Sequence, residues 1–193
     1  MPAFVCQGFA PLQEGVEPTP EQLASIVCDS LAAADAGAAG SMGETDSGVV
    51  FAGLGEPLLR AGALLEVVSL VASRQNGIAF RVNTNGLVDQ DVASLLLSSD
   101  IVAKGDADFR RETRLESISV FLPCADPASY LRIMSPEGGK GFGDVCAFIV
   151  SMAEAGVSVE CTGVDRPGID LEATRKLALS LGARSFRARP YHP

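Results

Sequence analysis

The chain has 193 residues, of which 47% are hydrophobic and 20% are charged, and its formal net charge is −9. This composition predicts one globular domain with a buried core and excludes a disordered chain. The 24 acidic residues outnumber the 15 basic ones. A nucleic-acid partner is therefore not expected, because phosphate contacts need clustered Lys and Arg. The single histidine, His192, argues against a His-based triad and against a His-ligated zinc enzyme.

The five cysteines stand at positions 6, 28, 124, 146 and 161, and no C-x-x-C occurs. Scattered single cysteines are typical of reduced, mostly buried thiols, so the sequence predicts a cytoplasmic protein. The first residues show no basic region followed by a long apolar run, and no apolar stretch reaches 18 residues. We therefore expect neither a secretory signal nor a membrane partner.

The first half of the chain alternates helical and strand-like segments. Residues 1–18 are predicted to be irregular, and residues 19–193 to form one α/β core. A Thr-Pro-Glu-Gln sequence at 19–22 caps a first helix, whose apolar residues follow at helical spacing. A connector rich in Gly, Ala and Ser then covers 37–48. The pattern continues with a strand over 49–52, a helix over 58–73, a strand over 78–82 and a helix over 89–97.

The second half repeats the alternation after a charged stretch. Residues 98–116 are expected to be a solvated insertion or a surface helix, with a short strand or turn at 101–102. Strands follow at 118–122, 157–162 and 185–189, with helices after Asp126, over 142–156 and after Asp170. Five short apolar strands predict a mainly parallel sheet buried on both faces, in a doubly wound domain or a partial barrel. Both architectures place ligands at the carboxyl ends of the strands.

Two polar segments follow predicted strands. In GLGEP at 53–57, the glycines allow a ligand to approach the backbone, while Glu56 holds an amine or simply favours the start of the helix. The segment matches neither a dinucleotide fingerprint nor a P-loop. NTNG at 83–86 offers hydrogen bonds to a carboxylate or ribose. Composition alone favours the plainer interpretation for both segments, which is a turn without a ligand.

Three further candidates lie near strand ends. Ser119 is placed to point into a barrel, and Cys124 follows the same strand. For Cys124 the favoured interpretation is an inert buried thiol. The segments 163–168 and 187–191 bring arginines near an anionic ligand, unless those arginines form surface salt bridges.

The order of these segments carries a resemblance to a known family. Residues 49–57 (VVFAGLGEP) resemble the second-strand G-x-G-E-P signature of radical S-adenosylmethionine (radical SAM) enzymes. Residues 81–87 (RVNTNGL) resemble their third-strand segment, and residues 118–130 (ISVFLPCADPASY) their fourth strand. Residues 142–166 and the ending 181–191, with its R-x-R-P-Y, are most similar to the radical SAM proteins associated with TatD-type nucleases. The resemblance covers roughly residues 20–191.

The resemblance implies a partial (β/α)₆ TIM-like barrel that binds S-adenosylmethionine (SAM) and a [4Fe–4S] cluster for radical chemistry on an unknown substrate. It implies that segment 53–57 binds the amino group of the SAM methionine, with Glu56 assisting. It also implies that Ser119 faces the ribose or carboxylate, and that Val164 flanks the adenine. The residues that would line the SAM site are Gly53, Gly55, Glu56, Pro57, Asn83, Thr84, Asn85, Ser119 and Val164.

The sequence departs from the family at the cluster. A C-x-x-x-C-x-x-C loop normally supplies three thiolates, and this chain has no such motif. Cys6 stands about where the last thiolate is expected, and Cys28 falls within a predicted helix. We therefore expect the first barrel strand and most of the cluster loop to be missing, and reductive cleavage of SAM not to occur. Two explanations stay open: a piece of a longer radical SAM protein, or a non-catalytic binding module with a protein partner at the unpaired edge of strand 49–52.

Overall fold

The computed structural model describes residues 17–35, 48–53, 55–105, 112–136 and 138–191, with only the backbone described at 34 and 35. Most of the irregular N-terminus and most of the connector lie outside these residues. Within them, five strands form one sheet whose parallel pairing is the one that the alternating pattern predicts. Their order is β1-β2-β3-β4-β5, which the pattern left open. The strands are β1 (Gly48–Phe51), β2 (Ala79–Thr84), β3 (Arg114–Phe121), β4 (Ser158–Asp165) and β5 (Ser185–Pro190). The helices are α1 (Pro20–Asp35), the 3₁₀ helix η1 (Pro57–Arg60), α2 (Ala61–Ala72), α3 (Gln90–Ser98), α4 (Pro127–Met134), α5 (Phe142–Glu154) and α6 (Leu171–Ser180).

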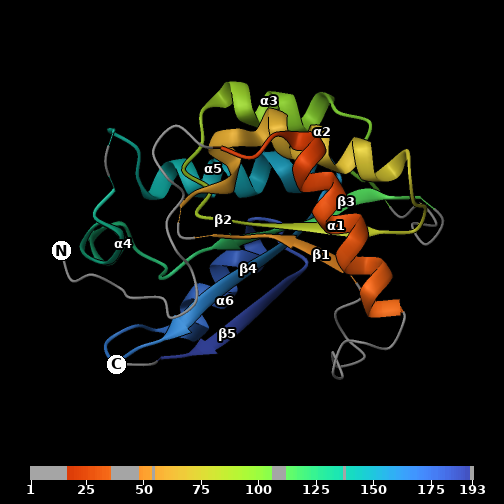
Figure 1. Cartoon of the computed structure of the whole chain (residues 1–193). Helices are drawn as coiled ribbons and strands as arrows, with labels where there is room; N and C mark the ends of the chain where they lie inside the picture. Colours follow the sequence, from red (N-terminus) through yellow and green to blue (C-terminus); the bar gives the residue numbers. More distant parts are fainter. Residues whose placement is uncertain (1–16, 36–47, 54, 106–111, 137, 192–193) are drawn as a thin grey trace.

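Helices cover one face of the sheet (Figure 1). Helices α2, α3 and α5 lie on this face, where α2 contacts β3 and α5 contacts β4, and α1 packs against α2. Helix α6 packs against β4 and β5. The carboxyl ends of the strands lie to the left in Figure 1, where β5 leads to the marked C-terminus. This one-sided layering is that of a partial (β/α) barrel, in which the uncovered face lines the interior.

The uncovered face of the sheet is polar. Along β2 every second side chain is buried, and those between, including Arg81 and Asn83, are only half-buried. The strand register sets Asn83 beside Ser119, and Ser119 beside Glu160. The prediction that both faces of the strands are buried is therefore wrong for β2, because side chains alternate between faces and only one set packs on helices. It holds near the carboxyl ends of β3 and β4, where Ser119 and Thr162 are 2% and 3% exposed.

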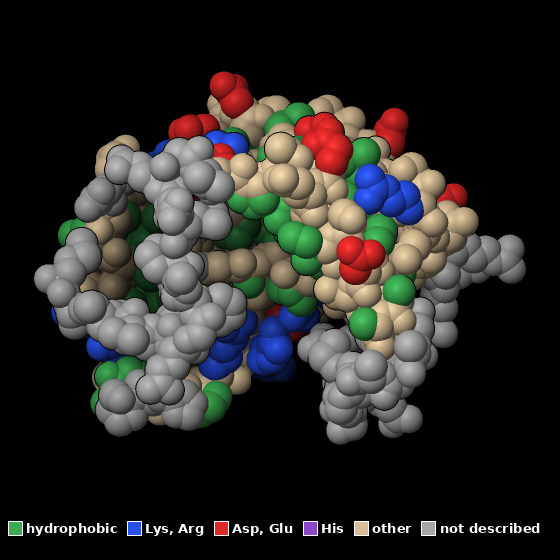
Figure 2. Space-filling view, in the orientation of Figure 1, with side chains coloured by type: hydrophobic (Ala, Val, Ile, Leu, Met, Phe, Trp, Pro, Cys, Tyr) green, Lys and Arg blue, Asp and Glu red, His purple; other side chains and the backbone are tan. Residues whose placement is uncertain are grey.

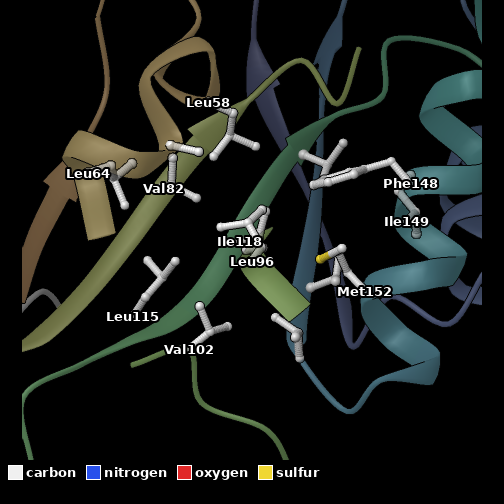
Figure 3. Close-up of a cluster of buried hydrophobic side chains, with 14 of the residues drawn as sticks. Leu58, Leu64, Val82, Leu96, Val102, Leu115, Ile118, Phe148, Ile149 and Met152 are labelled. Carbon is white, nitrogen blue, oxygen red and sulfur yellow. The ribbon is translucent and has the colours of Figure 1, made fainter. Parts of the chain in front are cut away.

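The core lies between the sheet and its helices (Figure 3). Leu58 from η1, Val82 and Ile118 from neighbouring strands, and Ile149 from α5 are fully buried. Burying each such side chain contributes about 1.5–3 kcal/mol relative to leaving it exposed. This packing holds the βα connections at the carboxyl ends of the strands in place.

The charged stretch 98–116 contains an isolated bridge and the start of a strand. Strand β3 begins at Arg114, four residues before the expected start at 118. Leu115 is fully buried, and Val102 is 3% exposed and forms an isolated bridge with it. The expected strand or turn at 101–102 is thus a single bridge, and the early start of β3 was hidden because charged residues flank Leu115 on both sides. Residues 106–111 lie outside the described part, and the bounds of the insertion stay a prediction.

Among the described residues, no helix has the length and apolar character that crossing a bilayer requires.

Candidate ligand-binding site

A cavity of about 210 Å³ opens at the carboxyl ends of the strands. Most of the residues predicted to bind SAM meet in its lining, although they come from three separate strand ends. Phe121, Thr162 and Arg189 complete the lining from β3, β4 and β5. The predicted residues in the lining are Gly53, Gly55, Glu56, Asn83, Thr84, Asn85 and Ser119. Pro57 lies beside it, in a shallow hollow shared with Phe51, Ala52, Gly53, Gly55 and Glu56.

Glu56 joins the β1 connection to the end of β2. Its Oε1 accepts the Leu58 backbone N–H at 3.0 Å, which caps η1, and the Thr84 hydroxyl at 2.7 Å. Its Oε2 accepts the Asn85 backbone N–H at 2.8 Å. The sequence left two interpretations of Glu56, a helix-capping residue or a ligand contact, and the structure is compatible with both at once. The same carboxylate caps a helix, ties two strand ends together and faces the cavity.

The turn after β2 is held by its own side chains. Thr84 Oγ1 accepts the Gly86 backbone N–H at 3.0 Å, and Asn85 Oδ1 accepts the Leu87 backbone N–H at 2.8 Å. Gly86 has φ +72°, and an added Cβ would meet Val145 Cγ2 at 2.8 Å. Asn85 thus fills the structural role that the turn alternative assigns to it. Asn83 differs, because its Oδ1 is buried without a hydrogen-bond partner among the described residues.

Steric crowding does not explain why Gly53 and Gly55 stand in the connection after β1. A Cβ added to Gly55 would meet nothing within 4 Å, and one added to Gly53 would meet only Gly55 N at 3.9 Å. Neither residue has a positive φ. Bare backbone at these two positions leaves room in the cavity for a ligand to approach it.

Glu160 does not line the cavity, but it holds side chains next to it. It forms an ion pair with Arg187 at 2.8 Å, and it accepts weaker hydrogen bonds from the hydroxyls of Ser119 at 3.4 Å and Ser185 at 3.5 Å. Ser119 is 2% exposed, so this contact orients its hydroxyl group beneath the cavity. Arg187 follows the alternative of a salt-bridged arginine, whereas Arg189 forms no ion pair with another described residue.

A second cavity, of about 340 Å³, adjoins the first. Phe121 lines both cavities, and Val164 lines the second. The guanidinium of Arg166 lies 5.7 Å from the centre of the Tyr191 ring, which is a cation–π arrangement. The remaining lining residues are Pro123, Ile133 and Pro190. An apolar cavity with an aromatic rim suits a flat ring such as adenine.

The described residues do not fit a [4Fe–4S] cluster. No group of three Cys, His, Asp or Glu side chains within the described ranges is placed to hold a metal. Cys28 lies half-buried on α1 and Cys124 is buried beside α4. Burial raises the pKa of the Cys124 thiol, which keeps it protonated and agrees with the inert interpretation. Cys6, the predicted metal candidate, lies outside the described residues.

This chain matches known proteins in its structure but not in its sequence. No protein-family model matches the chain, and no curated protein matches it. A search of solved structures finds Streptococcus suis SuiB bound to the precursor peptide SuiA, at TM-score 0.64 and 13% identity over 95% of this chain. It also finds TYW1 with a lysine-pyruvate adduct bound, at TM-score 0.61 and 16% identity over 97% of this chain. Both are radical SAM proteins.

The fold is of the radical SAM type. The chain corresponds to 35% of the SuiB chain and 59% of the TYW1 chain. These similarities support the predicted α/β partial barrel, and they carry no information on an association with TatD-type nucleases. At such low identity they concern the fold alone.

Sequence reasoning missed two of the cavity residues, Phe121 and Thr162. Both residues lie at strand ends next to the motifs, and this position could have identified them. The sequence does not say, however, which face of the sheet a single residue at a strand end points to. Arg189 was noted only as one cation of the closing segment. The structure distinguishes it from Arg187, which stands two residues earlier and pairs with Glu160.

Proposed function

We propose that this chain binds SAM at the carboxyl edge of its sheet, as a radical SAM-type protein. The observation that carries the proposal is the shared cavity. Seven of the nine SAM-site residues that the resemblance implies, from separate strand ends, line one hollow on a fold of the radical SAM type. A turn without a ligand does not account for this convergence.

The two adjoining cavities suit the two ends of SAM. The first is lined by Glu56, Asn83 and Ser119, which are polar groups that match the amino acid end. The second is lined by Phe121, Pro123 and Val164 and accommodates the adenine ring. The ribose would then cross Phe121, which lines both cavities. Val164 flanks the ring as the resemblance implies.

Radical chemistry is not part of this proposal, because the described residues do not hold a cluster. In radical SAM enzymes the [4Fe–4S] cluster supplies the electron that breaks the carbon–sulfur bond of SAM. In this chain the described residues bind and orient the cofactor and cover one side of it. Whether the cluster comes from the rest of a longer radical SAM protein, or the chain is a binding module without catalysis, stays open.

The proposal is tested by titrating the purified chain with SAM in a calorimeter. We expect saturable binding with a dissociation constant below about 1 mM, which corresponds to about −4 kcal/mol. Gly55→Ala adds a methyl group to the cavity without a protein clash, and it should weaken binding at least tenfold. Gly62→Ala is the matched control, because its Cβ also meets nothing within 4 Å but lies on α2. No heat with SAM, or equal effects of the two substitutions, would contradict the proposal.

A further inference from the structure

A groove of about 520 Å³ lies on the helical side of the sheet, lined by one side of α2 and by the end of α3 with the turn that follows it. It is larger than either cavity at the strand ends, and it shares no lining residue with them. Leu65, Leu95 and Ile101 form its apolar part. Leu95 is 41% exposed, although its side chain is large and apolar. The groove therefore leaves apolar surface of two neighbouring helices in contact with solvent.

Small residues keep the groove open. On α2, Gly62, Leu65 and Ser69 recur at helical spacing and share one face, which spans two turns or about 10 Å. On the other side stands Ser98, the last residue of α3. Gly62 has no positive φ, and a Cβ added there would meet nothing within 4 Å. Neither the backbone nor crowding among the described residues requires glycine at this position, so a larger side chain would occupy part of the groove.

Two carboxylates border the apolar part. Glu66 lies on α2 and Asp100 follows α3, so the groove has an acidic residue on each side. Both are exposed, and neither makes an ion pair or a side-chain hydrogen bond with another described residue. The nearby cation Lys104 instead donates to the carbonyls of Leu97 and Ser99, at 2.6 and 3.4 Å. The two acidic side chains are thus available to a cationic partner.

The surroundings of the groove carry the same charge. In Figure 2 most of the Asp and Glu side chains lie over the upper half, where Figure 1 places α1, α2 and α3. A group of Lys and Arg side chains lies in the lower half, where Figure 1 places β4 and β5. The whole chain has a net charge of −9. The helical side therefore attracts a basic partner and repels an acidic one.

We propose that the groove between α2 and α3 binds a basic amphipathic helix of a partner protein. An apolar channel between two helices, with charged residues on both sides, has the geometry of helix-in-groove recognition. Leucine-like side chains of the partner helix, one turn apart, fill the space beside Leu65 and Leu95. Its lysines or arginines pair with Glu66 and Asp100. This surface is separate from the proposed SAM site, and neither proposal depends on the other.

The test titrates the full chain into a dye-labelled amphipathic peptide of about 14 residues, with leucines on one helical face and lysines on the other. Fluorescence anisotropy measures binding, and we expect a dissociation constant below about 100 μM at low salt. The same peptide with glutamates in place of the lysines should not bind. A scrambled peptide of unchanged composition, which lacks the apolar face, should bind at least about tenfold more weakly.

Two variants change the groove without removing a core side chain. Gly62→Leu fills it, and should weaken binding of the lysine peptide at least about tenfold. Gly143→Leu on α5 is its control, because a Cβ there also meets nothing within 4 Å. The double variant Glu66→Gln/Asp100→Asn should weaken binding about fivefold at low salt, and by less at high salt, because two exposed ion pairs are lost.

Matched controls separate the groove from total charge and from folding. Asp29→Asn/Glu154→Gln removes the same two charges from exposed positions on α1 and α5, and should change the affinity by less than about twofold. Thermal unfolding of Gly62→Leu should match or exceed that of the wild type, because leucine favours a helix more than glycine does. Weaker binding by this variant then does not come from loss of the fold.

The outcomes decide the assignment. Weaker binding by Gly62→Leu and by the Glu66/Asp100 double variant, with both controls unchanged, supports it. No binding of the lysine peptide, equal binding by Gly62→Leu, or equal binding of the scrambled peptide overturns it. A dimer in size-exclusion chromatography that Gly62→Leu abolishes, without peptide binding, assigns the groove to a second copy of this chain and overturns the basic partner.

Discussion

The carboxylate of Glu56 holds together the two strand ends that frame the cavity, and its removal should destabilise the protein. Glu56→Ala deletes the bonds to Leu58, Thr84 and Asn85, at 3.0, 2.7 and 2.8 Å. A capping bond contributes about 1 kcal/mol. Each bond to a charged acceptor contributes about 1.5 kcal/mol. Water can reach the half-buried groups after the substitution, so we expect a loss of about 3 kcal/mol rather than the full amount.

Glu56→Gln removes the negative charge of the side chain but keeps nearly the same shape. The amide retains one carbonyl oxygen, which can serve Leu58 and Thr84, but it turns an N–H toward the Asn85 backbone N–H. Two donors then face each other, and the expected loss is about 1.5 kcal/mol.

Urea unfolding at neutral pH measures both losses as shifts of the midpoint at constant slope. Glu66→Ala is the control, because Glu66 is an exposed acidic residue on α2, and its effect should stay within about 0.5 kcal/mol. A double-mutant cycle of Glu56→Ala with Thr84→Val should show a coupling of about 1 kcal/mol. Losses below about 0.5 kcal/mol for both Glu56 variants, or no coupling to Thr84, would refute this reasoning.

Three further predictions concern the packing and protonation of buried groups. Gly86→Ala should cost at least about 2 kcal/mol, because it combines φ +72° with a contact of 2.8 Å to Val145. Gly138→Ala, with φ +73° and open space, should cost clearly less in the same thermal unfolding experiment, and equal losses would contradict the packing argument. Tyr130→Phe should leave stability unchanged or raise it by up to about 1 kcal/mol, because the Tyr130 hydroxyl is buried without a hydrogen-bond partner in the described residues; a clear loss in urea unfolding would show that the hydroxyl is satisfied. Burial raises the pKa of the Cys161 thiol to about 12, so the folded chain keeps a proton that the unfolded chain releases above about pH 9. Stability should therefore fall between about pH 9 and 12, and the fall should be shallower by about one proton in Cys161→Ala, measured as the free energy of unfolding against pH; parallel curves would contradict this.

The sequence alone determined most of the secondary structure and the parallel pairing, because these depend on local features. The Thr-Pro-Glu-Gln start of α1 and the Asp caps of α4 and α6 are signals within a few residues. Short apolar segments separated by helices require parallel pairing. The start of β3 was missed for the same reason, since the apolar signal at Leu115 is a single residue among charged ones.

The tertiary structure alone decided what the strand-end residues do. Glu56 meets Thr84 and Asn85 across 28 and 29 residues of sequence, and no local pattern encodes that distance. The polar uncovered face of the sheet depends on which side of each strand the helices cover. Arg187 and Arg189 are equivalent in the sequence, and the register of β4 with β5 gives Glu160 to Arg187 and leaves Arg189 facing the cavity. Charge pairing depends on separations of a few ångströms, and only the packed strands set those separations.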